Sequence, residues 1–163
     1  MIAILYPKGD EDASYLAYKI RAGALGQGVD VYIPPRAGRR ATLPKEIKDI
    51  LKKARSGFFL VADPEIGLDN ATWREIKFLL DSKKKVKALI PGEWMGLDLL
   101  KGLLQQGDIL IYNPDKPSRM VELLRREVEQ VKMEKESEQA LLAVGLLGIA
   151  LLLMWGISAK GKG

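Results

Sequence analysis

The stretch FFLVADPEIGLDNATWREIKFLLDSKKKVKALI, residues 58–90, decides the fold class. An apolar run at residues 57–62 is typical of a strand that is buried on both faces, and a second apolar run follows at residues 86–90. Between them, residues 70–81 place their large apolar side chains at helical spacing. A strand, a helix and a strand in this order predict a βαβ unit with parallel strands.

The same alternation continues on both sides of this unit. Further strands are expected at residues 2–6, 29–33 and 109–112, and further helices at residues 13–25, 45–54, 97–104 and from about residue 118 onward. Strands that are apolar on both faces predict a parallel sheet covered on both sides by helices. We therefore expect an α/β domain of the doubly wound class, with five parallel strands in the flavodoxin-like order 2-1-3-4-5.

The expected domain occupies residues 1–131, and a long apolar segment follows it. Residues 140–157 read ALLAVGLLGIALLLMWGI, without a single charge. At about 1.5 Å per residue, this helix is roughly 27 Å long, close to the ~30 Å hydrocarbon thickness of a bilayer. We predict one transmembrane helix here, joined by a polar stalk at residues 132–139 and followed by a short basic tail at residues 158–163. A buried core helix or an oligomerisation helix is the alternative.

The position of this segment predicts the orientation of the chain. The N-terminal residues MIAILYPKGDED lack the pattern of a signal peptide, because their apolar stretch is short and soon turns acidic. The domain is therefore expected on the cytosolic side, as in tail-anchored proteins, with the lipid bilayer as partner. No strict G-x-x-x-G motif occurs in the segment, and self-association is left open.

Composition excludes several kinds of chemistry. Cysteine and histidine are both absent, so disulfides, Cys/His metal sites and His-dependent catalytic triads are ruled out within one chain. No calcium-loop spacing appears, and no metal is expected. The net charge of +5 includes two lysines of the basic tail, which argues against nucleic acid as a partner. Abundant Lys, Arg and Glu with scarce Asn, Gln and Thr favour a thermophilic source.

The helix start within the central stretch resembles that of nucleoside 2-deoxyribosyltransferases. In that family a strand-terminal acidic loop precedes a Gly-Thr-x-x-Glu-Ile helix start; here Thr72, Glu75 and Ile76 match, and Ala71 replaces the glycine. The resemblance implies that Glu75 is a catalytic carboxylate acting on the N-glycosidic bond of a nucleoside or of NAD, with no cofactor. One glutamate can stabilise an oxocarbenium-like transition state, or attack the anomeric carbon, without a histidine.

The layout over roughly residues 2–131 also resembles that of TIR domains. These carry a Trp-Cys-x-x-Glu-Leu helix in the same place, and aligning Trp73 with that tryptophan puts the catalytic position on Lys77 instead of Glu75. Residues 34–44 correspond to the TIR loop that serves in substrate access and self-association. The two alignments stand as alternatives.

Several residues around Glu75 are candidates for substrate binding. Carboxylates can bind ribose hydroxyls, aromatic rings can stack on a base or nicotinamide, and a threonine belongs to the matched motif. These candidates are Tyr6, Asp12, Asp63, Asp69, Thr72 and Trp73.

Each of these patterns also has a purely structural interpretation. Thr72 and Glu75 have the spacing of a helix capping box, and a glutamate in a first helical turn is favoured by the helix dipole. Trp73 lies at the helical spacing of a core residue. Asp69 or Asn70 is a candidate helix N-cap.

Two alternatives to an enzyme remain. The Asp-Pro pair at Asp63 and the Lys-Pro pair at Lys116 resemble response-regulator receiver domains, but Tyr6 stands where those domains carry a metal-binding acidic pair. An inactive receiver-like fold, or more generally a membrane-tethered interaction, signalling or structural module, is therefore the alternative. Two basic clusters are candidates for contact with anionic lipid or nucleotide phosphate: Arg36, Arg39 and Arg40, and Lys83, Lys84, Lys85 and Lys87.

Overall fold

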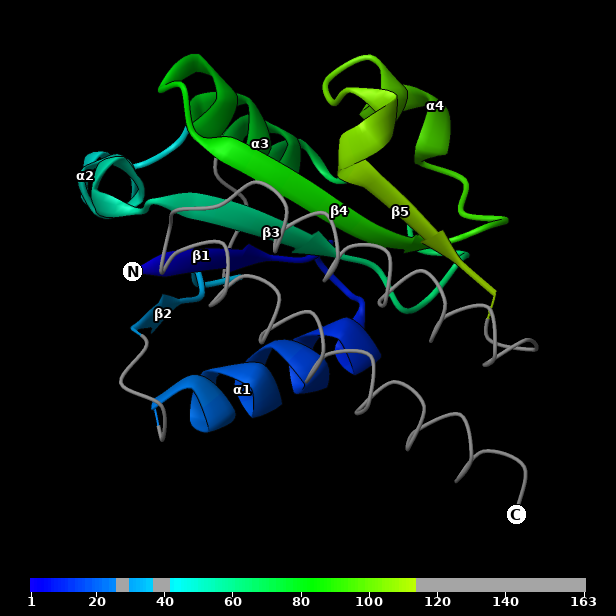
Figure 1. Cartoon of the computed structure of the whole chain (residues 1–163), viewed down its shortest axis with the longest axis horizontal. Helices are drawn as coiled ribbons and strands as arrows, with labels where there is room; N and C mark the ends of the chain where they lie inside the picture. The colour runs from blue at the N-terminus through cyan, green and yellow to red at the C-terminus, as the bar shows by residue number, and fades with distance from the viewer. Residues whose placement is uncertain (26–29, 37–41, 114–163) are drawn as a thin grey trace, which may run out of the picture.

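The computed structural model describes residues 1–25, 30–36 and 42–113. Five parallel strands form one sheet in the order β2-β1-β3-β4-β5 (Figure 1). This confirms the predicted parallel sheet and its flavodoxin-like order. The strands are β1 (Ile2–Leu5), β2 (Val31–Tyr32), β3 (Ser56–Leu60), β4 (Lys85–Pro91) and β5 (Ile109–Tyr112).

Helices cover both faces of this sheet. In Figure 1, α1 lies on one face, and α2, α3 and α4 lie on the other. This arrangement confirms the predicted doubly wound class for the described part of the chain. The helices are α1 (Glu11–Leu25), α2 (Lys45–Lys53), α3 (Asn70–Asp81) and α4 (Leu97–Lys101), and a single 3-10 turn (Gln106–Asp108) precedes β5.

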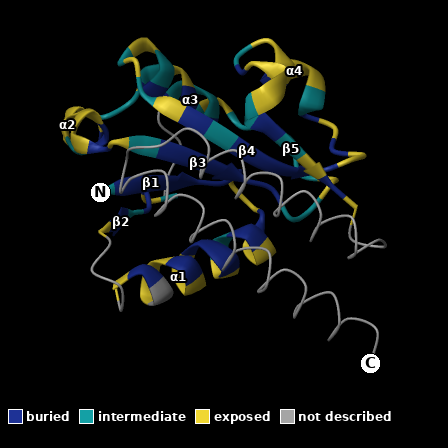
Figure 2. Ribbon diagram, viewed as in Figure 1, coloured by how far each residue is buried: buried dark blue, intermediate teal, exposed yellow. Residues whose placement is uncertain are grey.

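The core consists of two layers, one on each face of the sheet. Strand β1 contributes Ile2 and Ile4 to the layer under α1, and Ala3 and Leu5 to the layer under the other helices. This division follows from the two-residue period of a strand, which sends successive side chains to opposite faces. Figure 2 shows the strands and the inner sides of the helices as buried, with exposed residues on the outer sides.

Helix α4 is shorter than the sequence predicted. It ends at Lys101 instead of residue 104, and Gly102 is its C-cap. Leu104 is nonetheless buried, because the turn after the helix keeps it against the sheet. The apolar residues that predicted a longer helix are therefore buried partly in α4 and partly in the turn that follows it.

Several predicted segments lie outside the described residues. These are the last helix from about residue 118, the stalk at 132–139, the membrane helix at 140–157 and the tail at 158–163. Across residues 1–25, 30–36 and 42–113, no helix combines the length and the apolar character that crossing a bilayer requires.

Candidate functional site

The candidate site lies where three strands reach their carboxyl ends. Tyr6 follows β1, Arg36 comes four residues after β2, and the loop after β3 leads into α3, which carries Glu75. Strands β1 and β3 are neighbours in the sheet, and the chain leaves them toward helices on opposite faces. Doubly wound folds bind their ligands at such a switch point, and Glu75 lies at this edge of the sheet.

Glu75 and Arg36 form a buried ion pair at this edge. Nη1 of Arg36 donates to both carboxylate oxygens of Glu75, at 2.7 and 2.8 Å. The side chains are 2% and 12% exposed for Glu75 and Arg36 respectively. Burial raises the pKa of Glu75 above its ordinary value, although the Arg36 guanidinium opposes that shift. The pair joins the segment after β2 to the first turns of α3.

The other nitrogens of Arg36 have different surroundings. Nε donates to the main-chain carbonyl of Tyr6 at 3.0 Å, and the guanidinium lies over the Tyr6 ring, 5.0 Å from its centroid. Nη2 is buried and has no hydrogen-bond partner among the described residues. A buried cationic donor of this kind is costly unless an acceptor satisfies it. Arg36 therefore retains capacity for a further oxygen ligand.

Asp69 and Thr72 build the start of α3 around the same carbonyl. Asp69 is the N-cap and accepts a hydrogen bond from the Thr72 main-chain N–H at 3.0 Å, which confirms one of the two N-cap candidates. The Thr72 hydroxyl donates to Asp69 at 2.8 Å and also lies 3.1 Å from the Tyr6 carbonyl. Burial alone would raise the pKa of Asp69, but hydrogen bonds from Lys8 and Thr72 hold that pKa below its ordinary value.

The capping-box interpretation of Thr72 and Glu75 is wrong. A capping box requires the threonine at the N-cap and the glutamate bonded back to its main-chain N–H. Here Asp69 holds the N-cap, Thr72 lies inside the helix, and both oxygens of Glu75 bind Arg36. Glu75 is therefore not needed to cap its own helix.

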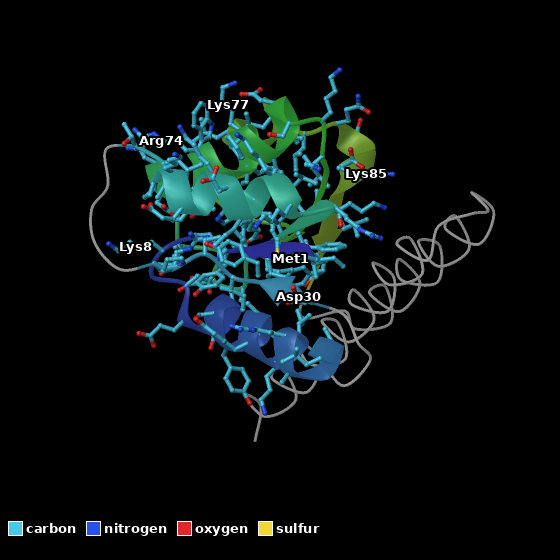
Figure 3. All side chains as sticks on the ribbon, turned by 90° about the vertical axis from the view of Figure 1, so that its left-hand side faces the viewer. Met1, Lys8, Asp30, Arg74, Lys77 and Lys85 are labelled. Carbon is cyan, nitrogen blue, oxygen red and sulfur yellow. The ribbon has the colours of Figure 1, made fainter. Side chains whose placement is uncertain are left out.

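A small pocket opens beside this ion pair. Its volume is about 30 Å³, which is room for one or two water molecules and far less than the 300–1,000 Å³ of typical ligand sites. Lys8 and Arg74, which both line the pocket, lie on the same side of the molecule in Figure 3. The charged lining consists of Lys8, Arg36, Asp69, Arg74 and Glu75.

The remaining predicted residues lie apart from the pocket. Asp12 is exposed on α1, and Trp73 is half-buried on α3; neither lines the pocket. Asp63 accepts the main-chain N–H of Glu65 at 2.9 Å and so closes a turn. The Tyr6 ring is buried in the core layer under α1, where its hydroxyl lies 3.1 Å from that of Ser14. The structure thus brings together Glu75, Asp69, Thr72 and the main chain of Tyr6.

The alternative alignment places the catalytic position outside the pocket. Lys77 is exposed and forms an ion pair with Asp81, one turn further along α3, at 3.0 Å. Figure 3 shows Lys77 at the outer surface of the molecule. Of the two residues that the alignments propose, Glu75 therefore lines the pocket and Lys77 does not.

Sequence reasoning missed Asp10. This carboxylate is 1% exposed and accepts three main-chain N–H bonds, from Ala13 at 3.0 Å, Ala62 at 2.8 Å and Asp63 at 3.1 Å. Burial raises its pKa despite these three donors. Asp10 thus ties the start of α1 to the end of β3. Its place directly before a helix was the available signal, since aspartate is a preferred N-cap.

The described residues offer no arrangement for a metal. Across residues 1–25, 30–36 and 42–113, no group of three acidic side chains converges on one point. The charged groups that line the pocket are carboxylate, guanidinium and ammonium groups.

Comparisons with known proteins found similarity among solved structures. No family model matches the chain, and no curated protein matches it. Among solved structures, the chain is similar to the TIR domains of the activated Roq1 resistosome that directly recognizes the pathogen effector XopQ. The TM-score is 0.44 and the sequence identity 8%, over 91% of this chain and 82% of that chain. The class of the chain is defined by its own topology, a doubly wound α/β domain with a charged site at the β1/β3 switch point.

Proposed function

We propose that this domain acts on a nucleotide, with Glu75 as the carboxylate that promotes cleavage of an N-glycosidic bond. The observation that carries the proposal is the position of Glu75, buried at the switch point beside Asp69. Buried carboxylates with perturbed pKa values in such places are characteristic of functional sites. Candidate substrates are NAD and nucleosides.

Arg36 has a defined role in this proposal. In the resting state it neutralises Glu75 and leaves a pocket of only about 30 Å³. A substrate phosphate binds guanidinium groups strongly, and Nη2 of Arg36 has no partner among the described residues. Phosphate binding draws Arg36 away from Glu75 and opens the pocket. This order of events favours a phosphate-bearing nucleotide such as NAD over a free nucleoside.

The proposed reaction uses the nucleotide as its substrate and needs no cofactor. The bond between the anomeric carbon and the base nitrogen breaks, and its electron pair leaves with the base. The freed Glu75 carboxylate stabilises the positive charge that develops on the sugar. Water adds to the anomeric carbon, and its proton passes to the departing base or to solvent.

Glu75→Gln is expected to lower base release by about a thousandfold or more, because the amide cannot stabilise the positive sugar. The measurement is incubation of the full chain with NAD and with nucleosides, followed by chromatography of the released base. The matched control is Glu65→Gln, an exposed glutamate outside the pocket, which should retain wild-type turnover.

Loss of folding must be separated from loss of chemistry. Glu75→Asp keeps the charge opposite Arg36 but withdraws the carboxylate by one methylene, so it should fold and still lose most turnover. Circular dichroism checks the fold of each variant. Normal turnover in Glu75→Gln would exclude the glutamate as the catalytic group.

A second candidate function is a non-catalytic interaction module. It is favoured by the small pocket and by the fact that Arg36 engages both oxygens of Glu75. In that case the ion pair only fixes the segment after β2 on α3. The absence of base release from every nucleotide tested, with the wild-type chain folded, would support this function.

We also propose that residues 140–157 anchor the domain in a membrane with its N-terminal part in the cytosol. The support is the uncharged length of this segment. The full chain should float with lipid vesicles and resist alkaline extraction. The double variant Leu147→Lys/Leu151→Lys should no longer float, since each lysine at the bilayer centre costs about 3 kcal/mol. Leu99→Lys, in the folded domain, is the control and should float like the wild type.

A further inference from the structure

Helix α1 has apolar residues on two sides. Its inner side is buried against the sheet through Ala13, Leu16, Ala17, Ile20 and Ala24. Its outer side carries Tyr15, Tyr18 and Leu25, whose exposed fractions are 52%, 52% and 61%. Figure 2 shows this helix with exposed residues along the side that faces away from the sheet. The solvent side of a surface helix is normally polar, so a second apolar stripe calls for an explanation.

The spacing of the outer stripe is that of a helix–helix contact. Tyr15, Tyr18, Ala22 and Leu25 are separated by three, four and three residues, and all four are exposed. This is the a/d pattern of a coiled-coil seam. Tyrosine is among the residues enriched at protein interfaces, because its ring supplies area while its hydroxyl remains compatible with water.

The charges beside the stripe indicate which partner fits. Glu11 and Asp12 stand in the first turn, and Lys19 and Arg21 stand two turns later. Within the described part of the chain, Asp12 and Lys19 take part in no ion pair, and Lys19 instead lies over the Tyr15 ring at 5.3 Å. The acidic residues precede the basic residues along the helix. Two copies of this face can therefore bring opposite charges together when their helices run antiparallel.

We propose that α1 is a self-association surface that pairs antiparallel with α1 of a second copy of this chain. Tyr15 then lies opposite Tyr18 of the second copy, and the two-fold axis passes between positions 16 and 17. In the same register Asp12 lies beside Lys19 of the second copy. The midpoint between positions 12 and 19 of the helix is within one residue of the two-fold axis. Each contact occurs twice, as a two-fold interface requires.

A parallel arrangement does not satisfy the same charges. In a parallel pair, positions 12 and 19 of the two copies lie on opposite sides of the seam, so Asp12 and Lys19 do not meet. One helix pair is smaller than the ~1,600 Å² of a standard interface, so the dimer is expected to be weak, with a dissociation constant of about 10–100 µM. This proposal is independent of any catalytic role of Glu75.

The first test measures the oligomeric state of the full chain in detergent by sedimentation, from about 1 to about 200 µM. The wild type should change from monomer to dimer over this range. Tyr18→Glu should weaken the dimer at least tenfold, because it places two charges in the seam. Leu99→Glu is the matched control on α4, where Leu99 is 60% exposed, and it should leave the dimer unchanged.

The second test examines the antiparallel register by charge reversal. Asp12→Lys and Lys19→Asp should each weaken the dimer several-fold, because each creates two like-charge contacts. The double variant Asp12→Lys/Lys19→Asp restores opposite charges at both positions and should return the dissociation constant to within threefold of the wild type. A wild-type chain that stays monomeric, a dimer indifferent to Tyr18→Glu, or a double variant no better than the single ones would each overturn the proposal.

Discussion

Arg36→Met is expected to lower the free energy of unfolding by about 3–5 kcal/mol, since removing one member of a buried ion pair leaves the other charge uncompensated. Methionine retains much of the aliphatic volume of arginine but offers no donor to Glu75, which is only 2% exposed. The Tyr6 carbonyl also loses the hydrogen bond from Arg36 Nε, although the Thr72 hydroxyl still lies within reach. Urea unfolding at neutral pH, followed by circular dichroism, measures the loss.

The double variant Arg36→Met/Glu75→Leu is the control for this prediction. Replacing both charges by apolar side chains removes the uncompensated carboxylate, so most of the stability should return. If the single variant costs less than about 1 kcal/mol, the pair behaves as an exposed salt bridge and the buried geometry is contradicted.

The same variant is expected to be more stable in acid than at neutral pH. Burial already raises the pKa of Glu75, and removing Arg36 removes the main influence that lowers it. A carboxyl whose pKa is higher in the folded state binds its proton more tightly there, so stability falls as the pH rises from the unfolded value of 4.5 through the folded value. The deficit of Arg36→Met should therefore shrink as the pH approaches 4.5. A deficit independent of pH would show that Glu75 is not the group left unpaired.

Asp10→Ala is expected to cost about 2–4 kcal/mol of unfolding free energy. The substitution leaves three main-chain N–H groups without their acceptor, and each buried orphan costs about 1–3 kcal/mol unless water reaches it. Two of these N–H groups, on Ala62 and Asp63, lie two and three residues after the end of β3, so the loss loosens the connection between α1 and the centre of the sheet. Thermal unfolding of the full chain measures the effect.

Asp12→Ala is the matched control, because Asp12 is an exposed aspartate of the same helix. In the monomer it loses only its favourable interaction with the helix dipole, worth less than about 1 kcal/mol. Asp10→Asn keeps one acceptor oxygen and should fall between the two alanine variants. Equal stabilities of Asp10→Ala and Asp12→Ala would refute the role of Asp10 as the link between α1 and β3.

The architecture was predictable because its signals are local. The bounds of α3 (Asn70–Asp81) and β5 (Ile109–Tyr112) coincide with the predicted residues 70–81 and 109–112. A helical or extended backbone imposes a period on the positions that meet the core, so each segment records its own conformation in its apolar spacing. The rule of right-handed crossovers limits the possible strand orders, and the observed order β2-β1-β3-β4-β5 is one that it allows.

The position of Glu75 at the edge of the sheet could be predicted from the sequence, and its bonding partner could not. The Thr72–Glu75 motif located the helix that carries the buried carboxylate, and the rule for parallel sheets located the edge. Asp12 and Trp73 were assigned by residue type alone, and both lie away from the pocket. Asp63 closes a turn by accepting the main-chain N–H of Glu65, so a structural role accounts for this carboxylate without a ligand.

The sequence by itself determined the alternation of strands and helices, since each of these elements depends on residues close together along the chain. Only the tertiary structure decided that Glu75 binds Arg36, which is 39 positions away, and that Asp10 binds the main chain 52 and 53 positions away. The physical reason is that the local spacing of side chains carries no record of such partners. A buried charge takes its counter-charge from whichever segment the completed sheet brings beside it.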